Sequence, residues 1–196
     1  MSQITGSLGT AAGVTNNGGD NRLLVSSVSR DMGLANAIEK GWAFSFADQA
    51  VTPTAAADVF CRISLTAGSD PLIITKIRAQ AASAEDILVQ HTANYTSATS
   101  HASGPTPANL NAAYQSSNLW SSKGDFESDV DITGDSGSVV VDDLRMAVAD
   151  TDYELTFPHG IVVPVGYSLL LEAVTGGVAL KYSVYGYLAQ DPYVNG

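Results

Sequence analysis

From Trp42 onward the chain consists of short runs rich in β-branched and aromatic residues, and clusters of turn residues separate each run from the next. Two of these runs, 42–46 and 153–157, alternate apolar and polar side chains with a period of two. This period places successive side chains on opposite faces of a strand, as in a half-buried β-sheet. Further strands are expected at residues 58–65, 72–78, 86–90, 138–141, 144–148, 161–163, 167–173 and 178–188.

Eight or more short strands, almost no helical periodicity and no alternation of strand with helix predict an all-β sandwich. No repeat of fixed period is visible, which disfavours a propeller or a solenoid. We expect turns at 158–160 and 164–166, and a hairpin turn at 175–177.

The run 58–65 indicates which of its side chains form the core. Alternation places Val59, Cys61, Ile63 and Leu65 on one inward face, with Phe60 on the other. Cys61 is therefore expected to be a small buried residue and not a nucleophile or ligand.

Residues 1–41 differ from the rest and are expected to form an extended N-terminal arm ahead of a sandwich domain at 42–196. Glycine, Asn, Ser and Thr dominate this segment, which favours turns; 22–28 reads as a strand and 33–40 as one or two helical turns. A disordered tail is one interpretation. An arm that orders on a neighbouring subunit is the other, because solubility alone does not call for its apolar residues. The contact residues expected for the arm are Ile4, Leu8, Arg22, Leu23, Leu24, Val25 and Val28.

Residues 91–122 form a long insertion without a single Lys, Arg, Asp or Glu. Connections of this length inside one domain are uncommon. It carries Leu110, Tyr114, Leu119 and Trp120, which a linker would not need. We expect an ordered insertion that packs on its own domain or on a partner, with a short helix at 108–115.

The overall charge excludes several classes of partner. With 9 basic and 20 acidic residues the formal charge is −11, which argues against general affinity for nucleic acid or an anionic membrane.

No apolar run approaches the roughly 20 residues of a membrane span. One cysteine excludes a disulfide scaffold. The N-terminus lacks a cationic start and an apolar core, so we expect no Sec-type signal peptide.

The acidic residues are concentrated, since 125–154 holds ten of the twenty, opposed only by Arg145. This segment is either a solvated face or a patch that fits a basic partner. An irregular Ca²⁺ or Mg²⁺ site at 129–135 is a further alternative. An EF-hand is excluded because Val140 occupies its twelfth position. The acidic candidates for a partner or cation patch are Asp125, Glu127, Asp129, Asp131 and Asp135.

The sequence offers little support for an enzyme. Gly134–Gly137 matches the nucleophile region of chymotrypsin-like proteases, with Ser136 as the nucleophile, but His91 and His101 lack that family's sequence context. A hydrolase that uses Ser136 stays an alternative. The histidines at 91, 101 and 159 form no ligand pair, and no nucleotide-binding loop is present, so we expect no catalytic residue, metal or cofactor.

Three tyrosines near the C-terminus, Tyr182, Tyr185 and Tyr187, are expected to be core and interface aromatics. Aromatic faces also stack on sugars in lectin-like sandwiches, so a glycan-binding surface is the alternative.

Several segments share a layout with one known family. A Gly-rich N-terminal segment contains Asp20–Val25 and is followed by Gly41–Phe46, by the strands 59–65 and 72–77, and by the strand–Pro-x-Gly–strand element at Gly160–Glu172. In this layout the chain resembles the small jelly-roll structural proteins of tailed-bacteriophage virions, above all the head decoration (cement) proteins.

The resemblance implies a jelly-roll β-sandwich and a non-enzymatic virion protein. Proteins of this group are typically trimers that sit on the capsid surface, bind the major capsid protein and stabilise the head. Tail-fibre and receptor-binding domains share this architecture, so a receptor- or glycan-binding spike domain is the alternative.

Overall fold

The computed structural model describes residues 4–5, 11–12, 14–17, 20–23, 32–93, 105–117, 119–132 and 137–189. The chain divides into two units, Met1–Met32 and Gly33–Gly196. In the first unit, β1 (Ile4–Thr5) pairs antiparallel with β2 (Ala11–Ala12), and β3 (Val14–Asn17) pairs antiparallel with β4 (Asp20–Leu23). The strand expected at 22–28 is described at 22 and 23; residues 24–28 lie outside the described residues.

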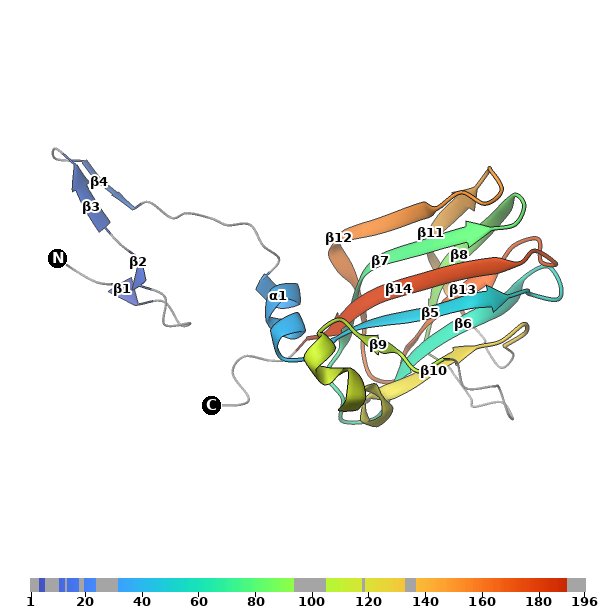
Figure 1. Cartoon of the computed structure of the whole chain (residues 1–196), viewed down its shortest axis with the longest axis horizontal. Helices are drawn as coiled ribbons and strands as arrows, with labels where there is room; N and C mark the ends of the chain where they lie inside the picture. The colour runs from blue at the N-terminus through green and yellow to red at the C-terminus, as the bar shows by residue number, and fades with distance from the viewer. Residues whose placement is uncertain are drawn as a thin grey trace. The chain divides into compact units, whose positions relative to one another are not determined.

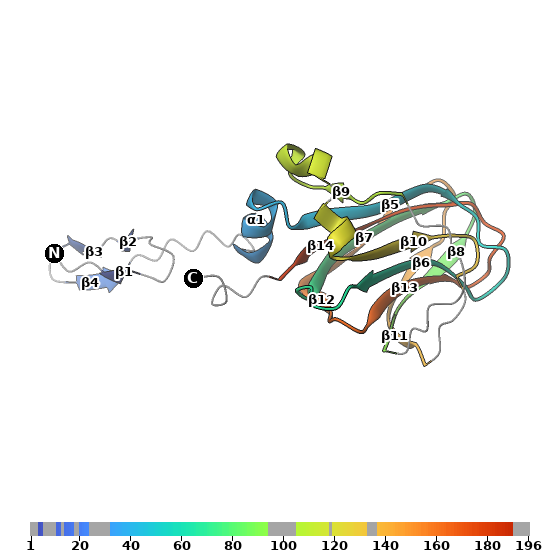
Figure 2. The same ribbon diagram turned by 90° about the horizontal axis from the view of Figure 1, so that it is seen from below.

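The second unit is an all-β sandwich of two antiparallel five-stranded sheets packed face to face (Figures 1 and 2). One sheet, called here the β14 sheet, has the order β12-β7-β14-β5-β9, and the other, the β13 sheet, has the order β10-β6-β13-β8-β11. The strands of the β14 sheet are β5 (Ala43–Val51), β7 (Leu72–Ala81), β9 (Ala108–Asn109), β12 (Tyr153–Val163) and β14 (Leu180–Leu188). Those of the β13 sheet are β6 (Asp58–Leu65), β8 (Glu85–Thr92), β10 (Gly124–Ser128), β11 (Val139–Met146) and β13 (Ser168–Ala173).

The strand order confirms a jelly roll. Without β9 and β10, the two sheets reduce to β12-β7-β14-β5 and β6-β13-β8-β11. Every connection between consecutive strands of this set then crosses from one sheet to the other, except the one from β8 to β11. This is the arrangement of two interleaved Greek keys that defines a jelly roll.

The long insertion lies in that exceptional connection, between β8 and β11. Its described part contributes β9 to the edge of one sheet, and β10, which follows it, joins the edge of the other. In place of the expected helix at 108–115, two 3₁₀ segments form, Ala112–Ser117 and Leu119–Ser122. Trp120 enters the core, 5.4 Å from Phe44 and 4.6 Å from Phe46 between ring centroids. The described part of the insertion therefore packs on its own domain.

A β-bulge corrects the expected face of β6. The register with β13 passes from Leu171–Cys61 to Glu172–Val59, so Phe60 is the extra residue. Phe60 therefore joins Cys61, Ile63 and Leu65 in the core between the sheets. Val59 instead packs with Ile132 and Leu170 on the opposite face. Strict alternation failed here because a bulge shifts the pleat by one residue.

Two expected turns are also corrected. Residues 158–160 do not end a strand but form an irregularity within β12, where pairing with β7 is interrupted between Thr156 and Ile161. Pro158, which has no N–H to donate, is tolerated there because β12 is an edge strand. The turn at 175–177 is not a hairpin, since β13 and β14 belong to different sheets. It carries the chain across the sandwich, and Glu85 accepts N–H bonds from Thr175 (2.8 Å) and Gly176 (3.1 Å) there.

One α-helix is described, α1 (Met32–Glu39), which agrees with the expected helical turns. Leu34, Ala37 and Ile38 on this helix pack against Ala43 and Tyr187 of the β14 sheet. Residues 33–41, which were expected to be the end of the arm, thus belong to the sandwich unit. Within the described residues, no helix has the length and apolar character needed to cross a bilayer.

Candidate functional sites on the polar sheet face and the free strand edges

The outward face of the β14 sheet gathers polar side chains in cross-strand register. Lys76 on β7 lies opposite Thr156 on β12 and Tyr185 on β14, and Arg78 lies opposite Glu154 and Ser183. Side chains directly opposite on neighbouring strands share a face and come within contact distance. Three of the nine basic residues of the chain, Lys76, Arg78 and Lys181, therefore lie on two adjacent strands.

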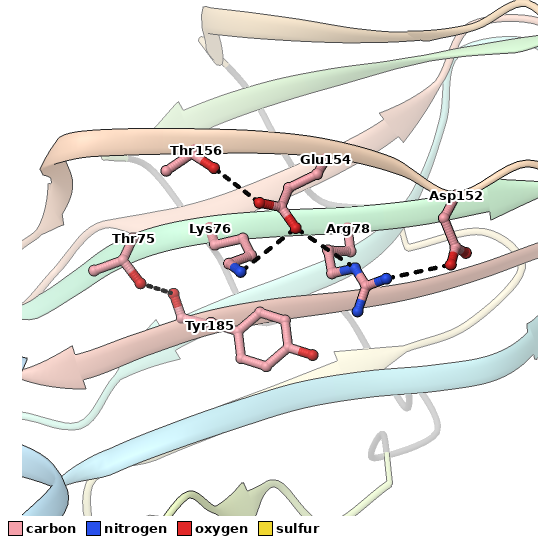
Figure 3. A network of polar contacts seen from close by, with 7 residues as sticks. All are labelled: Thr75, Lys76, Arg78, Asp152, Glu154, Thr156 and Tyr185. Atoms are coloured by element: carbon pink, nitrogen blue, oxygen red, sulfur yellow. Dashed lines mark hydrogen bonds and ion pairs between the residues drawn. The ribbon is translucent and has the colours of Figure 1, made fainter.

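Five side chains on β7 and beside or on β12 form one polar network: Lys76, Arg78, Asp152, Glu154 and Thr156 (Figure 3). The Glu154 carboxylate forms ion pairs with Lys76 Nζ at 3.4 Å and with Arg78 Nε at 3.7 Å. Arg78 Nη2 forms a further ion pair with the Asp152 carboxylate at 3.2 Å. Lys76 Nζ also lies 5.7 Å from the centre of the Tyr185 ring. All the charged members are more than a third exposed, so each pair contributes at most about 1 kcal/mol to stability. The arrangement instead presents fixed donors, acceptors and one aromatic ring to solvent.

A shallow open hollow of about 170 Å³ lies beside this network. Its polar lining comprises Gln49, Arg78, Gln80, Asp152, Lys181 and Ser183. Amide, hydroxyl and charged groups of both signs suit a small hydroxyl-rich ligand better than an apolar one.

The three C-terminal tyrosines separate into different environments. Tyr182 is 2% exposed in the core, where its ring meets Phe60 edge-on at 5.2 Å. Tyr187 is 8% exposed and packs beneath α1. Tyr185 alone of the three lies half-buried on the outward face. Of these three tyrosines, it is therefore the only one whose ring could stack on a sugar.

The other candidate site is the side of the sandwich where β11 and β12 end their sheets. On the opposite side the sheets end in the two-residue β9 and the five-residue β10, whereas β11 has 8 residues and β12 has 11. Among the described residues, no strand pairs with the outer edge of β11 or of β12. Val139, Val140 and Val141 on β11 are 55%, 53% and 41% exposed, and Val162 on β12 is 58% exposed. Free edges with exposed apolar side chains are surfaces on which another chain can add.

The predicted acidic residues do not converge. Asp125 and Glu127 lie on β10, where Asp125 is exposed and Glu127 pairs with the buried Arg62. Asp129 accepts the N–H of Val130 at 2.7 Å, and Asp131 is exposed in the loop that follows. Asp135 lies outside the described residues. Among the residues that are described, no three His, Cys, Asp or Glu side chains gather as metal ligands would.

Of the predicted arm residues, Ile4 lies in β1, and Arg22 and Leu23 lie in β4. The other four arm residues lie outside the described residues: Leu8, Leu24, Val25 and Val28. The same holds for two features of the hydrolase alternative, His101 and residues 134–136 of the Gly134–Gly137 motif. His91 lies on β8 near the Tyr167 ring, with 6.4 Å between ring centroids, and His159 is exposed in the irregular part of β12.

Cys61 is fully buried, which confirms the expectation that it is a core residue. Burial raises the pKa of its thiol to about 12, so at neutral pH it is a protonated thiol and a poor nucleophile. Its neighbour Tyr182 also has a raised pKa, again because burial disfavours the charged form.

Comparison with known proteins finds no family model, no curated protein and no solved structure that matches the chain. Sequence reasoning missed the polar face because its members come from three strands. The sequence of a single strand does not determine its register against the other two. The available signal was local: Lys76 and Arg78 stand two apart, as do Ser183 and Tyr185, so each pair was bound to share a face.

Proposed function

We propose that the protein is a structural subunit of a bacteriophage virion, a decoration or cement protein that binds the surface of the head and stabilises it. The observation that carries this proposal is the side of the jelly roll where β11 and β12 end, with long free edges and exposed valines. Apolar side chains beside unpaired N–H and C=O groups are characteristic of surfaces that pack on another protein.

In this proposal the main partner is the major capsid protein, the site of action is the capsid surface, and no cofactor or catalytic residue is involved. The resemblance noted above adds a homo-oligomer, specifically a trimer, as a prediction. The N-terminal unit is proposed to contact a neighbouring subunit or the shell. Many weak contacts of this kind produce tight attachment because a lattice presents them together.

The test measures how many copies of the purified full chain co-sediment with phage heads that lack it. The double variant Val140→Lys/Val162→Lys places charges on both edge strands and is expected to lower occupancy at least about tenfold, since an unpaired charge in an interface is costly. Val174→Lys is the matched control, because Val174 is 39% exposed and lies beyond the end of β13. Full occupancy by the double variant would refute the role of these edges, and no binding by the wild-type chain would refute the proposal.

The proposed role of the arm has its own test. Deletion of residues 1–30 is expected to reduce occupancy on the same heads while the sandwich unit stays folded. Undiminished occupancy would show that the arm does not contribute to binding of the head.

A second candidate function is a receptor- or glycan-binding domain of a tail fibre or spike, favoured by the polar hollow that Arg78, Lys181 and Ser183 help to line and by the half-buried Tyr185, two residues along β14 from Ser183. A glycan array probed with the purified chain tests this function. Binding that is lost in Tyr185→Ala and in Lys181→Ala, but kept in Tyr167→Ala, would support it. Tyr167 is a suitable control because it is 40% exposed and follows the turn at 164–166. A silent array together with binding to heads would favour the first function.

A further inference from the structure

The outer edge of β11 differs from that of β12 in how well it can accept a strand. Pro158 and the irregularity between Thr156 and Ile161 interrupt β12 near its middle. On β11 the only register shift lies between Val140 and Asp142, and the run Asp142–Met146 pairs regularly with β8. Bulges and proline on an edge discourage strand addition, so β11 is the more receptive of the two.

The charges on this run make it complementary to itself. Asp143 and Arg145 are both exposed, two residues apart, and flank Leu144, which faces the core. When two identical strands pair antiparallel about a two-fold axis, one residue faces its own copy, and the residues on either side of it face each other. With Leu144 on the axis, Asp143 of each copy faces Arg145 of the other, and all five residues of the regular run are paired.

The neighbouring registers are worse. An axis through Asp142, Asp143 or Arg145 brings two like charges directly opposite, which destabilises a cross-strand pair. An axis through Met146 places Arg145 opposite Ala147, so no ion pair forms and part of the regular run is unpaired. Among axes within 142–146, Leu144 alone combines opposite charges with full pairing.

We infer that β11 pairs with β11 of a second copy of this chain, antiparallel and centred on Leu144, with two reciprocal Asp143–Arg145 ion pairs. The contact joins the two β13 sheets into one continuous ten-stranded sheet. This inference rests on the proposed function, which treats the free edge of β11 as a protein-binding surface. The inference names a second copy of the chain as one partner of that surface. In a trimer held by other surfaces, it would link one trimer to the next.

A five-residue edge is a small interface, so the association is expected to be weak and to depend on concentration. On a lattice the same contact gains from the high local concentration of neighbouring copies.

The test is sedimentation velocity of the full chain at low salt, from about 5 µM to about 500 µM, where small interfaces associate. All charge variants carry Asp86→Asn, because Asp86 lies 3.9 Å from Arg145 Nε and would otherwise repel an acid placed at 145. Asp143→Arg and Arg145→Asp are each expected to weaken association at least about tenfold. The double variant Asp143→Arg/Arg145→Asp restores opposite charges in both pairs and is expected to return to within about threefold of the Asp86→Asn parent.

Asp125→Arg is the matched control, since it makes the same change in charge at an exposed position on β10, the other edge of the same sheet. It is expected to associate as the parent does. Circular dichroism of each variant verifies that the fold is retained.

Three results would overturn the inference. The first is the absence of concentration-dependent association in the wild-type chain, which would mean that the charges keep this edge unpaired. The second is association of the single variants equal to that of the parent, and the third is a double variant that does not recover. Loss of association on deletion of residues 1–30, with no effect of the charge variants, would assign the contact to the arm instead. Binding to phage heads is measured separately, so a variant that binds heads but no longer self-associates separates this contact from the proposed function.

Discussion

The hydroxyl of Tyr182 on β14 donates a hydrogen bond of 2.8 Å to Ser128 Oγ on β10, and this bond joins the two sheets inside the sandwich. Ser128 in turn donates to Asp48 Oδ2 on β5 at 2.7 Å. The thiol of Cys61 on β6 is also hydrogen-bonded to the Tyr182 hydroxyl. Four side chains, taken alternately from the two sheets, thus form one polar chain through an otherwise apolar core.

Removal of either partner of the first bond is expected to destabilise the fold. Tyr182→Phe and Ser128→Ala should each lower the free energy of unfolding by about 1–3 kcal/mol, because a buried polar group loses its partner. In the double variant the losses should be less than additive, with a coupling of at least about 0.5 kcal/mol. Urea denaturation of the four proteins measures this. Tyr185→Phe, on the outward face, is the control, and strictly additive losses would contradict the linkage.

Trp120 is expected to anchor the insertion. It is 2% exposed and stacks edge-on with two phenylalanines, so Trp120→Ala should cost about 3–5 kcal/mol. Leu110→Ala, in the same insertion at a position that is 38% exposed, should change stability by no more than about 0.5 kcal/mol. A loss for Trp120→Ala no larger than that of Leu110→Ala would show that the insertion does not contribute to the core.

Gly176 and Gly177 form a matched pair for the turn between β13 and β14. Both have positive φ, +74° and +70°, but a Cβ at Gly176 would strike the backbone of Ala55, whereas a Cβ at Gly177 meets nothing within 4 Å. Gly177→Ala should therefore cost about 1 kcal/mol from backbone conformation alone. Gly176→Ala should cost clearly more, and equal thermal shifts in the two variants would contradict the close contact with Ala55.

The buried Cys61 thiol predicts a loss of stability in alkali. Its pKa is raised from 9.0 to about 12 by burial, so between these values the unfolded chain releases a proton that the folded chain keeps. The stabilising contribution is present below about pH 9 and is lost as pH rises toward 12. Cys61→Ala should make the decline of stability with pH shallower over this range, as followed by urea unfolding at a series of pH values. An unchanged slope would contradict the assignment.

Much of the sandwich could be predicted because a strand that is buried on one face alternates apolar and polar residues along its sequence. The bounds expected for β6 are those observed, and β7, β8, β13 and β14 differ only at their ends. β10 was missed because Phe126 is its one large apolar residue and acidic side chains flank it. Its alternation of Gly124, Phe126 and Ser128 with Asp125 and Glu127 was nevertheless a usable signal.

What the sequence could not predict was mostly long-range. Which sheet each strand joins decides whether 175–177 is a hairpin or a crossing, and a local turn motif does not contain that information. The polar network around Glu154 likewise depends on the register of β12 against β7, which the irregularity at 157–160 resets. The bulge at Phe60 had a similar effect on the face of Val59.

The place of the insertion in the jelly roll has a mechanical consequence. One continuous stretch of chain, from β9 through Trp120 to β10, is hydrogen-bonded to a strand of each sheet and acts as a clasp across that side of the sandwich. The layers can part there only if the tryptophan first leaves the core. Transient opening should therefore begin at the opposite side, and backbone amides of β11 should exchange with deuterium before those of β5 and β6.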